Sequence, residues 1–119
     1  MVNLSVDPAQ YGLTFTKVPA AKDAIIYQVN MRAFSIAGNL QRVTERLDSI
    51  KSLGINVIYL MPVYPVGSLR GFNSPYAIKD YKAGVGTEFE TLDDFRALVN
   101  GAYSKNMAVM MDWVANHTA

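Results

Sequence analysis

The alternation of two hydrophobic periods along the chain is the feature that most constrains its fold. Short apolar runs at 24–29, 55–61 and 107–111 are typical of buried strands. Between them lie the segments 40–53 and 91–106, where apolar residues recur every three or four positions, as on one face of a helix. Nearly continuous apolar strands are typical of a parallel sheet. The order β-α-β-α-β therefore predicts an α/β fold with parallel strands joined by crossover helices.

Local signals mark the ends of both predicted helices. Asn39 is a favourable N-cap for the first helix, and Gly54 lies where a left-handed C-terminal cap is expected. Thr91 and Asp94 match a capping pattern at the start of the second helix. Asn106 is the expected cap at its C-terminus.

A long loop over residues 62–90 separates the second strand from the second helix. Loops of this length in compact domains are usually functional. Four of its aromatic residues either pack the loop or stack on a sugar ring, since tyrosine has an apolar face and a polar tip. These four are Tyr64, Phe72, Tyr76 and Tyr81.

Residues 1–23 show no sustained period and are predicted to form an irregular leader or linker. Tyr11, Phe15 and Val18 are the residues that would attach this leader to a core. Residues 24–119 are predicted to form the folded unit. By pattern alone this unit is either a small doubly wound domain or the opening of an eight-stranded barrel, which as a whole needs about 200 residues or more.

The composition excludes several classes of function. Half of the residues are hydrophobic, so disorder is excluded. With 11 basic and 10 acidic residues and no basic stripe, nucleic acid is not an expected partner. The chain has no cysteine, which rules out disulfides and zinc–thiolate sites. No apolar run approaches the roughly 20 residues of a membrane span, and no signal peptide is recognisable, so the protein is either cytoplasmic or exported after loss of a signal.

Polar residues follow the ends of the predicted strands, where function gathers in both architectures. His117 is the only histidine in the sequence. It is predicted to be either a surface residue or a group that hydrogen-bonds a ligand hydroxyl. Asp112 is read as a carboxylate that holds its own loop, in preference to a general acid or nucleophile. Asn116 is either a loop cap or an oxygen ligand for a hard cation.

The residues in these positions resemble the α-amylase family of glycoside hydrolases, in the first part of its (β/α)8 catalytic barrel. The run Asp112-Trp113-Val114-Ala115-Asn116-His117 fits the family pattern Asp-x-Val-x-Asn-His. One departure is Glu90, because the family more often has a glycine directly after the phenylalanine at this point. The similar blocks, in family order, are residues 26–34, 38–62, 74–81, 86–95 and 112–117.

The resemblance implies a partial TIM barrel and a role for each matching residue. His117 would hydrogen-bond the sugar next to the cleaved bond, and Tyr76 would stack on that same sugar. Asp112 would hold the shape of the site, and Asn116 would help to bind a structural calcium ion in members that keep one. No organic cofactor is implied.

The family's catalytic carboxylates lie on later strands, and none of the acidic residues here matches them. We therefore expect a fragment of a retaining glycosidase that acts on α-glucans such as starch but is inactive by itself. The alternatives are a non-catalytic α-glucan-binding module and, less favoured by the motifs, a complete doubly wound domain with an unrelated ligand. Because an opened barrel exposes strand edges, we also expect the isolated chain to be marginally stable or to self-associate.

Overall fold

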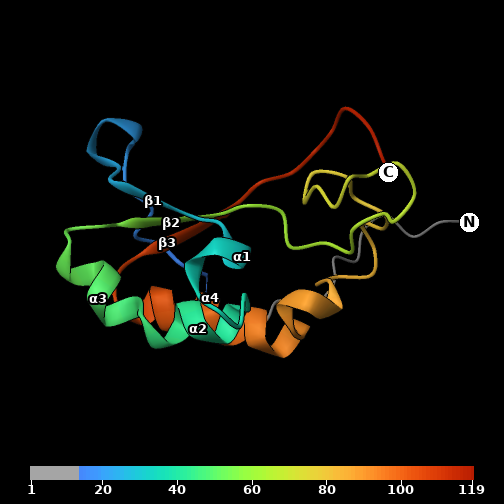
Figure 1. Cartoon of the computed structure of the whole chain (residues 1–119). Helices are drawn as coiled ribbons and strands as arrows, with labels where there is room; N and C mark the ends of the chain where they lie inside the picture. Colours follow the sequence, from blue (N-terminus) through green and yellow to red (C-terminus); the bar gives the residue numbers. More distant parts are fainter. Residues whose placement is uncertain (1–13) are drawn as a thin grey trace, which may run out of the picture.

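Three parallel strands form one sheet in the order β1–β2–β3 (Figure 1). The computed structural model describes residues 14–119. The strands are β1 (Ile26–Val29), β2 (Val57–Leu60) and β3 (Ala108–Met111). This arrangement confirms the predicted α/β order with parallel strands.

Each strand is shorter than the apolar run that predicted it. Ile55 and Met107 belong to those runs, but they lie before β2 and β3 and outside the strands. Both are buried in the core, with 7% and 0% of their surface exposed. Hydrophobicity therefore extends past the strand because the connecting turns also bury side chains.

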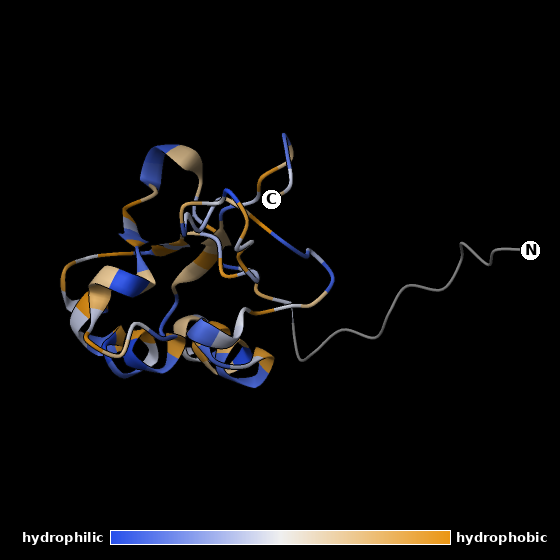
Figure 2. Cartoon of the chain, turned by 45° about the vertical axis from the view of Figure 1, so that its right-hand side comes forward, coloured by the Kyte–Doolittle hydropathy of each residue, from blue (hydrophilic) through white to orange (hydrophobic). Residues whose placement is uncertain are grey.

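The longer helices lie on one side of the sheet (Figure 1). They are α2 (Leu40–Glu45), α3 (Leu47–Ser52) and α4 (Leu92–Ser104). The core fills the space between these helices and the sheet, and Val29, Ile58 and Leu60 point into it fully buried. Figure 2 shows hydrophobic and hydrophilic residues alternating along the helices, as this one-sided packing requires.

The opposite face of the sheet is partly open. Ile26 on β1 is 50% exposed and Met110 on β3 is 42% exposed. In a closed barrel, side chains of this face fill the interior. The open face is thus the geometry expected for part of a barrel.

The prediction of one continuous helix over residues 40–53 was wrong in one respect. The helix is interrupted at Arg46, which separates α2 from α3. Two residues earlier, the hydroxyl of Thr44 donates a hydrogen bond of 3.2 Å to the carbonyl of Leu40. Such bonds compete with the helical ladder and bend helices, which gives a physical reason for the interruption.

The predicted caps of the first helical segment are confirmed. The Asn39 side chain accepts a hydrogen bond from the Arg42 amide at 3.2 Å. Gly54 has φ +84°, the left-handed conformation that glycine adopts without steric cost. Both ends of the segment are therefore set by local chemistry.

The caps of α4 are also confirmed. Thr91 and Asp94 form a complete capping box, in which each side chain bonds the backbone of the other. At the C-terminus, Asn106 has φ +58°, and the Met107 amide reaches back to the Ala102 carbonyl at 2.9 Å. This is the hydrogen-bond pattern of a Schellman motif.

Three short helical turns were not predicted. They are η1 (Ala21–Asp23), α1 (Met31–Phe34) and η2 (Thr87–Phe89). Each is only three or four residues long, so its apolar residues complete no period that a sequence pattern can reveal. The local signal for α1 is Asn30, whose side chain caps the turn by accepting from the Arg32 amide.

Glu90 follows η2 in a backbone conformation that is essentially restricted to glycine. Its φ is +86° and its ψ is −135°. The side chain is half-buried, and its Oε1 atom is buried without a hydrogen-bond partner. A glycine would adopt this conformation without the steric cost that the side chain of Glu90 incurs.

The segment before β1 contacts α4 through Phe15, whose ring stacks on Tyr103 with centroids 4.3 Å apart. Lys17 donates a hydrogen bond of 2.9 Å to the Asn106 side chain. Tyr11 lies outside the described residues, as does the rest of 1–13. No helix within residues 14–119 is long and apolar enough to cross a membrane.

Candidate functional site

The C-terminal ends of the three parallel strands meet at one edge of the sheet. There β2 leads into the long loop, which folds back on itself as a hairpin. Val66 and Ile78 form an antiparallel bridge. The amide of Lys79 donates to the Pro65 carbonyl at 2.8 Å. Backbone pairing therefore fixes the base of the loop.

The tail that follows β3 lies along this hairpin. The Ala119 amide donates to the Ile78 carbonyl at 2.8 Å. The Tyr81 hydroxyl hydrogen-bonds the carbonyls of Val114 and His117. Loop and tail are thus joined, and the tail's histidine is held beside the loop.

Two of the predicted sugar-binding residues line one depression. Tyr76, from the loop, and His117, from the tail, both border a hollow of about 620 Å³. Ser74 lies on the same wall, and its hydroxyl accepts a hydrogen bond from the Tyr76 amide at 3.2 Å. The structure therefore brings together residues that are far apart in the sequence.

Asp112 contacts the same site through the tyrosine. A hydrogen bond to the Asp112 carboxylate, with burial and the negative charge, raises the pKa of Tyr76 to about 12. A hydrogen bond to the same carboxylate also raises the pKa of Tyr59 on β2. Asp112 thus interacts with two phenols, one from the loop and one from β2.

Tyr59 is a site residue that the sequence analysis did not identify. It is paired with Met110 in the sheet register, and Asp112 lies two positions after Met110, just past the end of β3. Because strand side chains alternate, Tyr59 and Asp112 face the same side. The signal in the sequence was a tyrosine within an otherwise apolar strand.

Asn116 lies next to His117 and is exposed. Its Nδ2 atom is 3.2 Å from Nδ1 of the histidine ring. Calcium takes six to eight oxygen ligands, whereas no group of three or more acidic, histidine or cysteine residues gathers within the described part of the chain. Within that part of the chain, no cluster of carboxylates could therefore bind calcium by itself, and Asn116 is the one predicted oxygen ligand.

A larger hollow of about 750 Å³ lies at the opposite edge of the sheet. Ile26, Val57 and Ala108, the first residues of the three strands, line it. Its walls are mostly apolar, and it lies at the strand ends where barrel enzymes do not place their active sites. The depression between Tyr76 and His117 is accordingly the candidate site.

The comparison with known proteins points to one family. The family "Alpha amylase, catalytic domain" matches residues 13–119. Probable oligo-1,6-glucosidase 2 of Bacillus subtilis is 34% identical over 82% of this chain and 18% of its own length. Alpha-amylase 3 of Dictyoglomus thermophilum is 34% identical over 85% of this chain and 20% of its own. The chain thus spans about a fifth of the curated relatives it matches.

Solved structures agree with this match. The crystal structure of an alpha-amylase from Lactobacillus plantarum superimposes with a TM-score of 0.76 at 44% identity, over 82% of this chain and 24% of that one. An alpha-amylase from Geobacillus thermoleovorans, complexed with acarbose, superimposes with a TM-score of 0.76 at 31% identity. The match covers 85% of this chain and 25% of that one. These likenesses confirm the partial barrel. The chain belongs to the α-amylase family of glycoside hydrolases and forms the N-terminal portion of its catalytic domain.

Proposed function

We propose that this chain supplies one wall of the sugar-binding site of an α-amylase-type glycosidase acting on α-glucans. The observation that carries the proposal is the placement of Tyr76 and His117 on one depression at the C-terminal ends of the strands. Relatives named as amylases and oligo-1,6-glucosidases support the choice of substrate class. The whole protein would cleave its substrate with retention at the anomeric carbon.

In this proposal, Tyr76 stacks its ring on the apolar face of a glucose unit. The hydrogen bond from its phenol to Asp112 keeps the ring from rotating away. A ring held in advance costs less conformational entropy on binding than a free one. Asp112 therefore acts on the sugar through the tyrosine.

His117 is proposed to hydrogen-bond a hydroxyl of the same glucose unit. The amide of Asn116, 3.2 Å away, donates to Nδ1 of the ring. The neutral ring then carries its proton on Nε2, which is free to donate to the sugar. The Oδ1 atom of Asn116 would be one ligand of a calcium site completed outside residues 14–119.

The catalytic carboxylates are proposed to lie in the part of the relatives' length that this chain does not span. A retaining glycosidase needs two carboxyl groups about 5–5.5 Å apart. Among the described residues, no aspartate or glutamate lines the depression. The 119-residue chain alone should therefore bind glucan without cleaving it.

We also propose that the isolated chain self-associates weakly through the open face of its sheet. Ile26 and Met110 on that face are about half exposed, at 50% and 42%. Light scattering during size exclusion tests this idea. A strict monomer at every concentration would contradict it.

Calorimetric titration with acarbose tests the sugar-binding proposal. Tyr76→Ala should weaken binding at least about tenfold, the loss typical of a central aromatic contact. Phe72→Ala is the matched control, because Phe72 lies on the same loop, is 95% exposed and does not line the depression. Equal losses in both variants, or no binding by the wild type, would contradict the proposal.

A further inference from the structure

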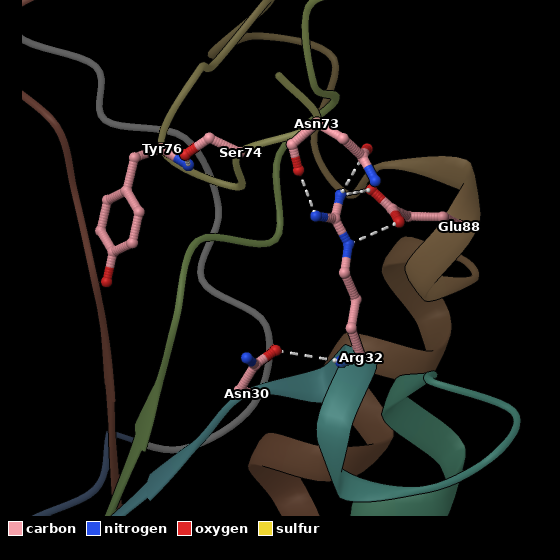
Figure 3. Close-up of polar contacts among 6 residues, drawn as sticks. All are labelled: Asn30, Arg32, Asn73, Ser74, Tyr76 and Glu88. Carbon is pink, nitrogen blue, oxygen red and sulfur yellow. Dashed lines mark hydrogen bonds and ion pairs between the residues drawn. The ribbon is translucent and has the colours of Figure 1, made fainter. Parts of the chain in front are cut away.

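Arg32 joins three segments of the chain that are distant in the sequence (Figure 3). Its guanidinium makes two parallel hydrogen bonds to Glu88, from Nε to Oε2 at 3.0 Å and from Nη2 to Oε1 at 2.7 Å. It also donates to the Asn73 carbonyl and, at 3.3 Å, to the Asn73 side chain. Arg32 belongs to α1, Glu88 to η2, and Asn73 to the long loop.

The environment of Arg32 makes this arrangement more rigid than an ordinary surface ion pair. The Arg32 side chain is only 27% exposed, and that of Glu88 is 43% exposed. The guanidinium lies over the ring of buried Phe89, 5.8 Å from its centroid. Two-point arginine–carboxylate pairs fix orientation as well as distance. Arg32 is therefore held in place before it contacts the loop.

The loop segment that it contacts is conformationally unfavourable by itself. Arg70, Phe72 and Asn73 all have positive φ angles, of 55°, 49° and 58°. Asparagine tolerates such angles, but for Arg70 and Phe72 they are uncommon and carry a steric cost that surrounding contacts must offset. The hydrogen bonds from Arg32 to Asn73 are contacts of this kind.

Asn73 leads directly to the sugar-binding wall. The next residue, Ser74, accepts a hydrogen bond from the Tyr76 amide at 3.2 Å. In Figure 3, the Tyr76 ring extends from this turn on the side away from Arg32. A displacement of Asn73 would therefore move the start of the turn that carries the ring.

We propose that Arg32, bound to Glu88, is a positioning residue that holds the Asn73–Tyr76 turn and thereby sets the Tyr76 ring beside His117. Arg32 lines no part of the depression, so it acts through the loop. The value of this positioning for glucan binding rests on the proposed function. The position of the ring can be measured without any sugar.

The titration of the Tyr76 phenol reports whether the ring reaches Asp112. In the wild-type chain its pKa is raised to about 12 by that contact. Tyr59 bonds the same carboxylate but lies on β2, so it serves as an internal control. NMR of tyrosine labelled at its ring carbons follows the ionisation of both phenols as the pH is raised. The variants Tyr76→Phe and Tyr59→Phe assign the two signals.

Arg32→Gln should lower the pKa of Tyr76 toward its ordinary value of 10.0 and leave that of Tyr59 raised. Arg32→Lys keeps the charge but lacks the two-point geometry. In this variant the pKa of Tyr76 should lie between those of Arg32→Gln and the wild type. Arg42→Gln is the matched control. It removes the same charge and another ion pair, with Glu45, and its guanidinium hydrogen-bonds Glu45 and not Asn73.

Three results would overturn the proposal. The first is an unchanged pKa of Tyr76 in a folded Arg32→Gln chain. The second is an equal fall in the pKa values of Tyr59 and Tyr76. The third is a fall in the pKa of Tyr76 that is as large in Arg42→Gln as in Arg32→Gln. If Arg32→Gln does not fold, Glu88→Gln tests the same ion pair with Arg32 still present. In that variant the pKa of Tyr76 should again fall while that of Tyr59 stays raised. Acarbose titration of the wild type separates the two claims, because absent sugar binding would refute the proposed function and leave the titration result intact.

Discussion

The carboxylate of Asp112, just past the end of β3, interacts with the phenol of Tyr76 on the loop after β2 and raises the pKa of that phenol to about 12. Two strand ends of the sheet are thus tied together by one polar contact. Tyr59 contributes a second phenol to the same carboxylate. This cluster supports the tyrosine ring that is proposed to stack on the substrate.

Asp112→Asn should lower the pKa of Tyr76 from about 12 toward 10.0, because the charged acceptor is lost. In the wild type, the folded-state pKa is above the unfolded one. The stability from this contact is therefore complete below about pH 10 and is lost as the pH rises toward 12. Urea unfolding at several pH values across this range measures the fall in the free energy of unfolding. In Asp112→Asn this alkaline fall should be absent. The same alkaline loss in the variant would show that the contact is not its cause.

Glu90→Gly should stabilise the chain. A non-glycine residue in this backbone region destabilises the folded state by about 1–3 kcal/mol. Glycine removes this strain, but it loses roughly 0.5–1 kcal/mol more conformational entropy on folding. A net gain of about 1–2 kcal/mol corresponds to a rise of several degrees in Tm, measurable by circular dichroism.

Glu90→Ala separates backbone strain from the buried carboxylate. It removes the Oε1 atom that has no hydrogen-bond partner but keeps a Cβ at φ +86°. The alanine variant should therefore gain less than the glycine variant. Equal Tm values for the two would rule out strain as the cause.

Thr91→Ala should destabilise α4 by about 1 kcal/mol, the usual cost of losing an N-cap side chain. The hydrogen bonds from Thr91 lower the pKa of Asp94 in the folded chain. The stability from Asp94 is thus complete above its ordinary pKa of 3.8 and is lost as the pH falls below that value. The cost of Asp94→Asn, measured by denaturant unfolding, should shrink on acidification. Asp93→Asn, on an 88% exposed side chain, should cost much less at any pH.

Tyr81→Phe should weaken glucan binding by a few-fold while leaving the fold intact. The hydroxyl of Tyr81 hydrogen-bonds the carbonyls of Val114 and His117. Its removal therefore loosens the tail, which stays attached through the Ala119 amide and the Ile78 carbonyl. The ring itself, 5.3 Å from that of Tyr64, stays packed. A net hydrogen bond contributes about 1 kcal/mol, which sets the scale of the effect. Acarbose titration of Tyr81→Phe measures it, and unchanged affinity would mean that the tail needs no such support.

The sequence predicts the parts of this fold that depend on local chemistry. Hydrophobic periods identify the strands and helices. The side chains of Asn39 and Thr91 cap their helices as predicted, and Gly54 adopts the predicted left-handed conformation. The interruption at Arg46 was missed because a Thr44 back-bond leaves the apolar period unchanged. Periodicity reports which face is buried and does not report whether the ladder is continuous.

The residues of the candidate site were predictable only where a recognisable motif contains them. Tyr76 and His117 were identified from the family resemblance, and the structure places both on one depression. The contacts that support them were not identified, because Arg32 and Glu88 meet only after the chain folds. No spacing rule links an arginine after one strand to a glutamate before a distant helix. Such pairs become visible only in three dimensions.

The most direct test of the central claim is a chemical-shift titration of the labelled 119-residue chain with maltotriose. The account predicts that the largest changes occur at Tyr76, His117 and their neighbours, that Tyr76→Ala abolishes them, and that the sugar remains uncleaved. Changes centred on the hollow lined by Ile26 and Val57, or no changes at saturating sugar, would contradict it.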